Sequence, residues 1–198
     1  MNYDEASSVK ELAAPVMKVL EGLEWECPKT ATYITHPIDC HICNGTGKAY
    51  YSYTPQVGEW IINEDKYVDL IAKIDGRGGL WTSHDYEDGS ICQHELVYIG
   101  VTNKCIPILH WEEIERVLEK AGYGVTVDEE LDRRRDKVFS VGIIWDRGAL
   151  SCDNMYSRQE AVCRAVIALG EMIKIDRGFF WAMSEANAKV VQEMDHET

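Results

Sequence analysis

The residues best suited to chemistry in this 198-residue chain form the run Cys40-His41-Ile42-Cys43-Asn44-Gly45-Thr46-Gly47-Lys48. Two thiolates three positions apart can chelate one metal ion, and Zn²⁺ is commonly held by such sulfur ligands. The two glycines let the backbone fold back, so that amide groups can point at the sulfur atoms. The pattern CxxCxGxGK is typical of a zinc knuckle, which usually serves as a structural staple.

A structural zinc ion takes four ligands, so two more are needed beyond this CxxC. Cys27 and His36 lie upstream, and with Cys40 and Cys43 they would form a closed Cys3His site for one structural zinc. His41 lies inside the CxxC and is expected to point away. The sequence holds no second CxxC, and a lone pair of reduced thiols is the alternative reading.

The net charge of −14 indicates which partners the chain can attract. An acidic field repels the phosphates of nucleic acids, which are normally bound by lysine and arginine, so direct nucleic-acid binding is not expected, although Arg133–Arg135 could form a local basic patch. The same field attracts a protein with a basic surface, although solubility alone also explains it. The candidate partner-binding residues are acidic: Glu112, Glu113, Glu115, Glu119, Asp128, Glu129, Glu130 and Asp132.

The composition also bears on the compartment. The apolar runs are too short for a transmembrane helix, and the acidic start Met1–Glu5 has no secretory signal. Seven cysteines without regular spacing suit a reducing cytoplasm, with Cys163 as a core residue. The sequence leaves open whether the chain is a monomer or a homodimer.

The pattern along the chain predicts an α+β fold, with an N-terminal helix and zinc knuckle with short strands (1–76) followed by an α+β sandwich domain (77–198) that could pack with it as one domain. In the first part, apolar spacing predicts a helix over Ser8–Glu24, and the aromatic run Tyr50–Tyr53 predicts a strand beside the knuckle. The spacing over Tyr67–Ile74 predicts a short helix, followed by a flexible loop at Asp75–Gly79.

The second part contains a predicted strand at Ile91–Ile99 and a C-terminal module of helix, strand, strand and helix, in which two helices cover a hairpin. The predicted elements of the module are a helix from Trp111 to Ala121 closed by Gly122, strands Tyr123–Val127 and Val138–Trp145 joined by a charged connection Asp128–Lys137, and a helix opened by the capping box Ser157–Glu160. The predicted core residues are Val138, Val141, Ile143 or Ile144, Trp145, Ala161, Ala165 and Leu169.

This module resembles the phage ABA sandwich domain, a family of uncharacterised phage and prophage proteins. The residues that carry the resemblance are Trp111–Lys120 and Ser157–Gly170, and the upstream knuckle is a second hint. The resemblance implies an accessory phage protein that binds a host protein, and the specific prediction is an acidic, anti-CRISPR-like inhibitor of a host defence nuclease. It brings no catalytic residues, and the segment 50–105 is longer than the usual pattern.

Two other classes of function stay open. A zinc site with an open position could activate water, which would make the chain a small zinc-dependent enzyme. The Gly76–Gly79 loop could capture a nucleotide, although it lacks a dinucleotide fingerprint. A further polar cluster of His84, Asp85, Cys92 and His94 could form a site, and a solvated loop with an edge strand explains it equally well.

Overall fold

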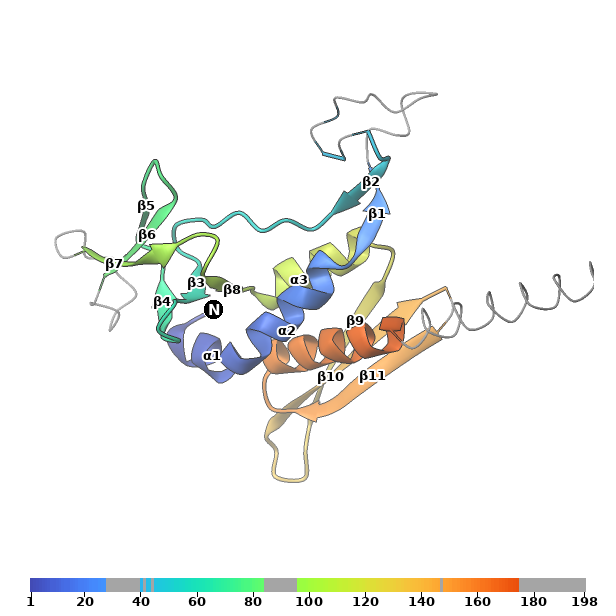
Figure 1. Ribbon diagram of the computed structural model, residues 1–198. Helices are drawn as coiled ribbons and strands as arrows, with labels where there is room; N and C mark the ends of the chain where they lie inside the picture. The colour runs from blue at the N-terminus through green and yellow to red at the C-terminus, as the bar shows by residue number, and fades with distance from the viewer. Residues whose placement is uncertain (28–39, 41, 44, 84–95, 147, 175–198) are drawn as a thin grey trace, which may run out of the picture.

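The computed structural model describes residues 1–27, 40, 42–43, 45–83, 96–146 and 148–174. It confirms the predicted α+β class: helices pack against several small antiparallel sheets (Figure 1). Among the described residues, no helix has the length and apolar character needed to cross a bilayer.

The N-terminal region contains two helices, α1 (Tyr3–Ser8) and α2 (Lys10–Glu21), where one helix over Ser8–Glu24 was predicted. The prediction missed α1, which begins with a capping box: the Asn2 side chain accepts the Glu5 amide, and the Glu5 carboxylate accepts the Asn2 amide. Helix α2 continues through Pro15 and ends three residues before the predicted end, because the chain enters strand β1 (Glu24–Glu26).

The C-terminal module contains a three-stranded antiparallel sheet in the order β11-β10-β9. Its strands are β9 (Gly124–Leu131), β10 (Lys137–Trp145) and β11 (Gly148–Met155). Helix α3 (Trp111–Lys120) confirms the prediction, and the C-terminal helix is described from residue 158 to residue 174.

Two details of the predicted module are wrong. Strand β9 continues through Leu131, so most of the predicted acidic connection is sheet, and the turn is confined to residues 132–136. Strand β11 was missed because Ser151, Cys152 and Asp153 have little intrinsic preference for strands. It forms because Leu150 and Cys152 pair with Ile143 and Val141 of β10.

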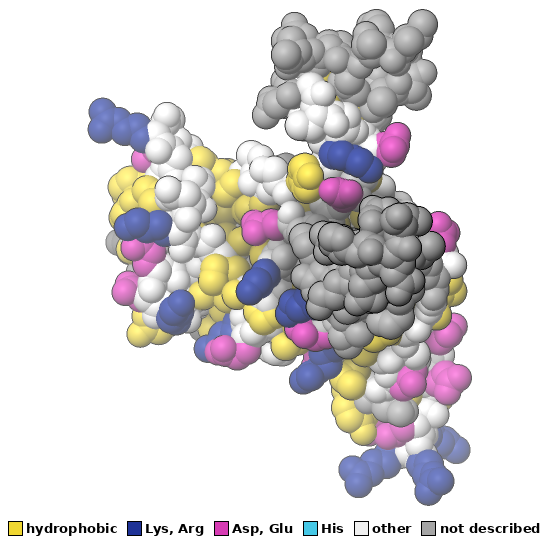
Figure 2. All heavy atoms as spheres, turned by 45° about the vertical axis from the view of Figure 1, so that its right-hand side comes forward, with side chains coloured by type: hydrophobic (Ala, Val, Ile, Leu, Met, Phe, Trp, Pro, Cys, Tyr) yellow, Lys and Arg dark blue, Asp and Glu magenta, His cyan; other side chains and the backbone are white. Residues whose placement is uncertain are grey.

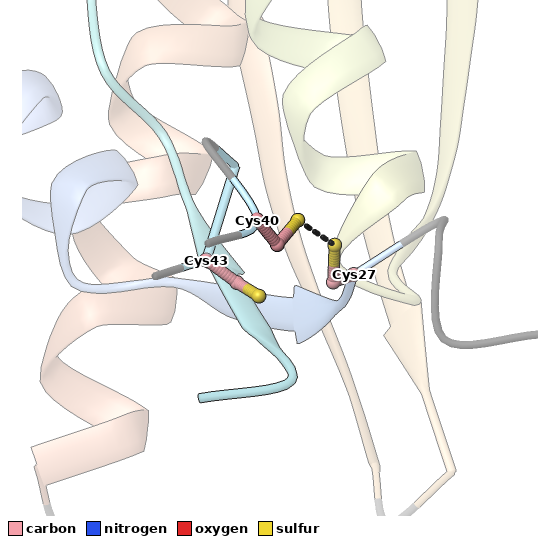
Figure 3. Close-up of side chains that lie close together, drawn as sticks. All are labelled: Cys27, Cys40 and Cys43. Atoms are coloured by element: carbon pink, nitrogen blue, oxygen red, sulfur yellow. Dashed lines mark hydrogen bonds between the residues drawn. The ribbon is translucent and has the colours of Figure 1, made fainter. Parts of the chain in front are cut away.

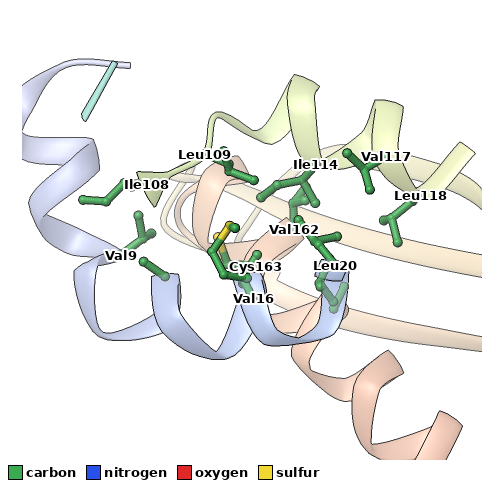
Figure 4. Packing of buried hydrophobic residues seen from close by; sticks show 14 of the residues in the cluster. Val9, Val16, Leu20, Ile108, Leu109, Ile114, Val117, Leu118, Val162 and Cys163 are labelled. Atoms are coloured by element: carbon green, nitrogen blue, oxygen red, sulfur yellow. The ribbon is translucent and has the colours of Figure 1, made fainter. Parts of the chain in front are cut away.

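The main hydrophobic core lies between the helices and one face of this sheet. Figure 4 shows Val16 and Leu20 of α2 beside Ile114 and Leu118 of α3 and Val162 of the C-terminal helix. Val141 and Ile143 of β10 belong to the same cluster, whereas Ile144 is 51% exposed on the opposite face. The predicted core residues Val138, Val141, Ile143, Ala161, Ala165, Leu169 and Cys163 are all buried, whereas Trp145 is only partly buried and packs against the cluster.

The same cluster contains Ala6, Leu20 and Trp60 from the first predicted part and Ile114 and Leu169 from the second. The two predicted parts therefore share buried surface.

Three smaller sheets complete the fold. Strands β1 and β2 (Lys48–Tyr50) form an antiparallel pair; β3 (Trp60–Ile62) lies between β4 (Val68–Leu70) and β8 (Ile106–Ile108); and β6 (Gly79–Ser83) lies between β5 (Lys73–Ile74) and β7 (Leu96–Val101).

The predicted helix over Tyr67–Ile74 is wrong, because this segment supplies strands β4 and β5. Of the predicted strand Tyr50–Tyr53, only Tyr50 lies in β2. The described part of the predicted strand Ile91–Ile99 lies in β7, which continues to Val101.

Candidate metal centre

The β1–β2 pair stands out from the body of the molecule and carries three cysteines at its end (Figure 1). Cys27 directly follows β1, and Cys40 and Cys43 precede β2. The strand register pairs Glu26 with Lys48, and the Cys27 amide extends the pairing by donating to the Gly47 carbonyl at 2.9 Å. The hairpin therefore brings the first cysteine back beside the other two.

Local hydrogen bonds shape the CxxC turn. The Cys43 amide donates to the Cys40 carbonyl at 3.3 Å, and the Thr46 amide and hydroxyl donate to the Cys43 carbonyl at 2.9 and 2.7 Å. Gly45 and Gly47 have φ angles of +79° and +75°, which residues with a Cβ rarely adopt. The two glycines of the motif are thus required by the turn, as the sequence predicted.

The three sulfur atoms converge in Figure 3. All lie within 4.8 Å of one another, and the Sγ atoms of Cys27 and Cys40 are 3.9 Å apart. The side chains are buried, and they form a cluster of their own, separate from the main core. Hydrogen bonding from the Ile42 backbone lowers the pKa of the Cys40 thiol, against the opposing effect of burial. Three buried thiols in this arrangement can hold a metal ion.

The structure therefore brings together three of the four predicted metal ligands. His36, the fourth, lies outside the described residues, as does His41. The cluster His84, Asp85, Cys92 and His94 also lies outside them.

The predicted acidic residues of α3 do not form one free face. Glu113 pairs with Arg116, and the Glu115 carboxylate lies 3.3 Å from the Arg158 guanidinium of the C-terminal helix. Glu112 and Glu119 are exposed, and Glu112 lies 3.6 Å from His110.

The other predicted acidic residues lie on the β9–β10 hairpin. Asp128, Glu129 and Glu130 are exposed along β9, and Glu129 pairs with Lys137 at 2.6 Å. Asp132 accepts the Asp136 amide within the turn. In Figure 2 acidic and basic side chains are mixed over the left and centre of the visible face, acidic side chains follow its right-hand edge, and basic side chains gather at its lower end. The β9–β10 turn itself carries Arg133–Arg135.

The glycine-containing loop at Asp75–Gly79 is a tight turn between β5 and β6. The Asp75 carboxylate accepts the Arg77 and Gly79 amides at 2.8 and 2.9 Å, and these hydrogen bonds lower its pKa. A bound phosphate would need such amides. Because the loop's own carboxylate uses them, the geometry disfavours nucleotide capture here.

Sequence reasoning missed one cavity. It has a volume of about 700 Å³ and lies between the β3–β4 turn and strand β7, lined by Tyr3, Tyr67 and Tyr98 and by the carboxylates of Glu64, Asp65 and Asp69. No motif marks it, because the lining comes from four separate segments.

Comparison with known proteins reveals no relative: no family model matches the sequence, and neither a curated protein nor a solved structure does. The resemblance to the phage ABA sandwich domain therefore stays a prediction.

Proposed function

We propose that this chain is a zinc-stapled binding protein whose partner is a protein with a basic surface. The observation that supports it best is the convergence of Cys27, Cys40 and Cys43 at the end of a projecting hairpin. These cysteines lie outside the main core, so a metal would hold the loops where hydrophobic packing does not reach. A loop made rigid in this way loses little entropy on binding, which favours its use in recognition.

Zinc is the metal that suits these donors. Zinc–sulfur bonds of about 2.3 Å in a tetrahedral site place sulfur atoms about 3.8 Å apart. The 3.9 Å between Cys27 and Cys40 matches this spacing. His36 remains our proposal for the fourth ligand, because it lies in the segment that joins Cys27 to Cys40.

The charge of −14 supports a basic partner. The specific partner that we propose is a host defence nuclease, whose nucleic-acid groove is a basic surface that an acidic protein can occlude. Glu112, Glu119 and Asp128 are exposed, and the only ion pair among them within the described residues is the 3.6 Å contact of Glu112 with His110. Glu115 is a poorer candidate, because its reversal would break the ion pair with Arg158.

The test is capture of proteins from a bacterial lysate by the immobilised, zinc-loaded full chain, followed by elution with duplex DNA or RNA. We expect a basic, nucleic-acid-binding protein that is retained at low salt, released as salt rises, and displaced by the nucleic acid, because exposed charges are screened over about 8–10 Å. Its nuclease activity should fall when the chain is added. Reversing Glu112, Glu119 and Asp128 to lysine should weaken capture while the fold stays intact. Capture that is independent of salt and unchanged by this reversal would refute the proposed mode of binding.

A further inference from the structure

The cavity between the β3–β4 turn and β7 is a built pocket whose polar lining includes two deeply buried groups. The side chains of Asn63 and Thr82 line it with exposures of only 9% and 1%. The Asn63 side chain holds two other lining residues in place. It accepts a hydrogen bond from the Tyr67 amide at 2.9 Å and donates one to the Asp69 carboxylate at 2.7 Å. The position of Asp69 is thereby fixed before any ligand arrives.

Tyrosines surround this cavity, and two of them are held by tryptophans. The Tyr3 ring contacts Trp60 edge-on at 5.7 Å between centroids, and the Tyr98 ring contacts Trp81 in the same way at 5.4 Å. Both tyrosines nevertheless remain about half exposed, and Tyr67 is 69% exposed. Exposed aromatic rings that are already ordered offer contact surface at little entropic cost.

The charged lining of the cavity has one sign. Glu64, Asp65 and Asp69 are carboxylates, and no lysine or arginine is among the described residues that line the cavity. Lys104 pairs with Glu64 from outside at 3.2 Å, whereas Asp65 makes no ion pair within the described part of the chain. Burial raises the pKa of the neighbouring Cys105 thiol, and Glu64 and Asp69 raise it further. The carboxylates of Glu64 and Asp69 thus both act electrostatically on the Cys105 thiol.

The spacing of these carboxylates disfavours a metal ion held by all three of them. Among the described residues, only Cys27, Cys40 and Cys43 bring three ligand atoms within 4.8 Å of one another, so these carboxylate oxygens do not form a metal cage. A guanidinium group spreads its charge over a plane with five donors, and it stacks on aromatic rings, which fits separated carboxylates beside tyrosines.

We propose that this cavity receives an arginine side chain of the protein that the chain binds. The proposal rests on the proposed function in that it names the group on the basic partner that is recognised. The carboxylates of Glu64, Asp65 and Asp69 accept from the guanidinium, and the Tyr67 and Tyr98 rings cover its faces. At about 700 Å³ the cavity also has room for the backbone beside that arginine.

The test is a titration of the ¹⁵N-labelled full chain with the peptide acetyl-Gly-Arg-Gly-amide. Matched peptides carry citrulline, which has the shape of arginine without its charge, or lysine. We expect saturable shifts of the Tyr98 and Gly100 amides with the arginine peptide, and affinity about tenfold weaker or worse with citrulline. The double variant Glu64→Gln/Asp65→Asn should weaken arginine binding by a similar factor. Both residues are exposed, and the only ion pair that the variant removes is the exposed one between Glu64 and Lys104. Glu11→Gln/Glu21→Gln on α2 removes the same charge from exposed residues elsewhere and should leave the affinity unchanged.

Several outcomes would refute the proposal that this cavity binds an arginine side chain. They are equal binding of citrulline, shifts confined to other surfaces, no saturable shift at millimolar peptide, tighter binding of the lysine peptide, and equal loss of affinity in the α2 control. The two proposals can fail separately. If the wild-type chain and the Glu64→Gln/Asp65→Asn variant capture the same lysate protein equally, the pocket is refuted and the proposed function stands. If arginine binds in the cavity but no basic protein is captured, the pocket stands without the proposed function.

Discussion

The Sγ atom of Cys27 lies 3.9 Å from the Sγ atom of Cys40, although the two residues are 13 positions apart in the chain. This separation is nearly twice the length of a disulfide bond, about 2.05 Å, so no disulfide bond joins the two sulfur atoms. Because Cys43 joins them, the strand pair presents three sulfur donors at one point rather than a cross-link. Metal binding and the order of this hairpin should therefore be coupled.

Removing one of these sulfur donors should release the metal and loosen only the hairpin. We expect about one zinc per chain in the purified protein and almost none in Cys40→Ser, measured by elemental analysis. The β1–β2 amides should then exchange rapidly, while α2 and β10 stay protected, because the cysteine cluster is separate from the main core. Cys152→Ser is the matched control and should keep its zinc. Cobalt substitution adds a second measurement, since thiolate ligation gives a charge-transfer band that Cys40→Ser should lose. Wild-type protein without stoichiometric metal would contradict the assignment.

Local sequence signals were enough where one interaction decides the structure. The CxxC with two glycines specified the knuckle turn because the turn needs positive φ angles at Gly45 and Gly47. The amphipathic spacing of Trp111–Lys120 specified α3 because only one face of it is buried.

Elsewhere, pairing with segments that are distant in the sequence determined the secondary structure. Residues 68–74 have apolar positions that fit either a helix or a strand, and pairing with β3 and β6 selects the strand. Strand β11 contains few residues with an intrinsic preference for strands, and its pairing with β10 makes it a strand. The tyrosine-rimmed cavity could not be predicted, because its lining residues meet only after the small sheets have formed.

Two adjacent residues of β10 provide a test of which face of the sheet is buried. Ile143 is fully buried against the helices, whereas Ile144 is 51% exposed on the other face. Ile143→Asp should prevent cooperative folding, because it places a charge in the core without a partner. Ile144→Asp should change the free energy of unfolding by less than about 1 kcal/mol. Thermal unfolding followed by circular dichroism distinguishes the two, and similar behaviour of both variants would refute the described register.

Gln159 joins the C-terminal helix to the start of α3. Its side chain is 3% exposed, accepts the Trp111 amide at 2.8 Å and donates to the Leu109 carbonyl at 2.8 Å. Gln159→Leu keeps much of the volume but leaves both backbone groups buried without a partner, so we expect a loss of about 1–3 kcal/mol in the free energy of unfolding. Urea titration measures this loss. The exposed Gln56→Leu is the control and should have little effect; an equally small effect at Gln159 would mean that these hydrogen bonds contribute little.

The thiol of Cys163 should make stability depend on pH in the alkaline range. It is buried in the C-terminal helix, and burial raises its pKa from 9.0 to about 11. The folded chain therefore holds this proton more tightly than the unfolded chain. The resulting contribution to stability is complete below pH 9 and is lost as the pH rises through about 11. Between pH 8 and pH 11, the wild-type protein should lose roughly 2 kcal/mol more than Cys163→Ala in the free energy of unfolding. Other groups that titrate in this range are present in both proteins and cancel in the comparison. Urea unfolding of both proteins at the two pH values measures the difference, and equal losses would show that the Cys163 thiol is not desolvated in the folded state.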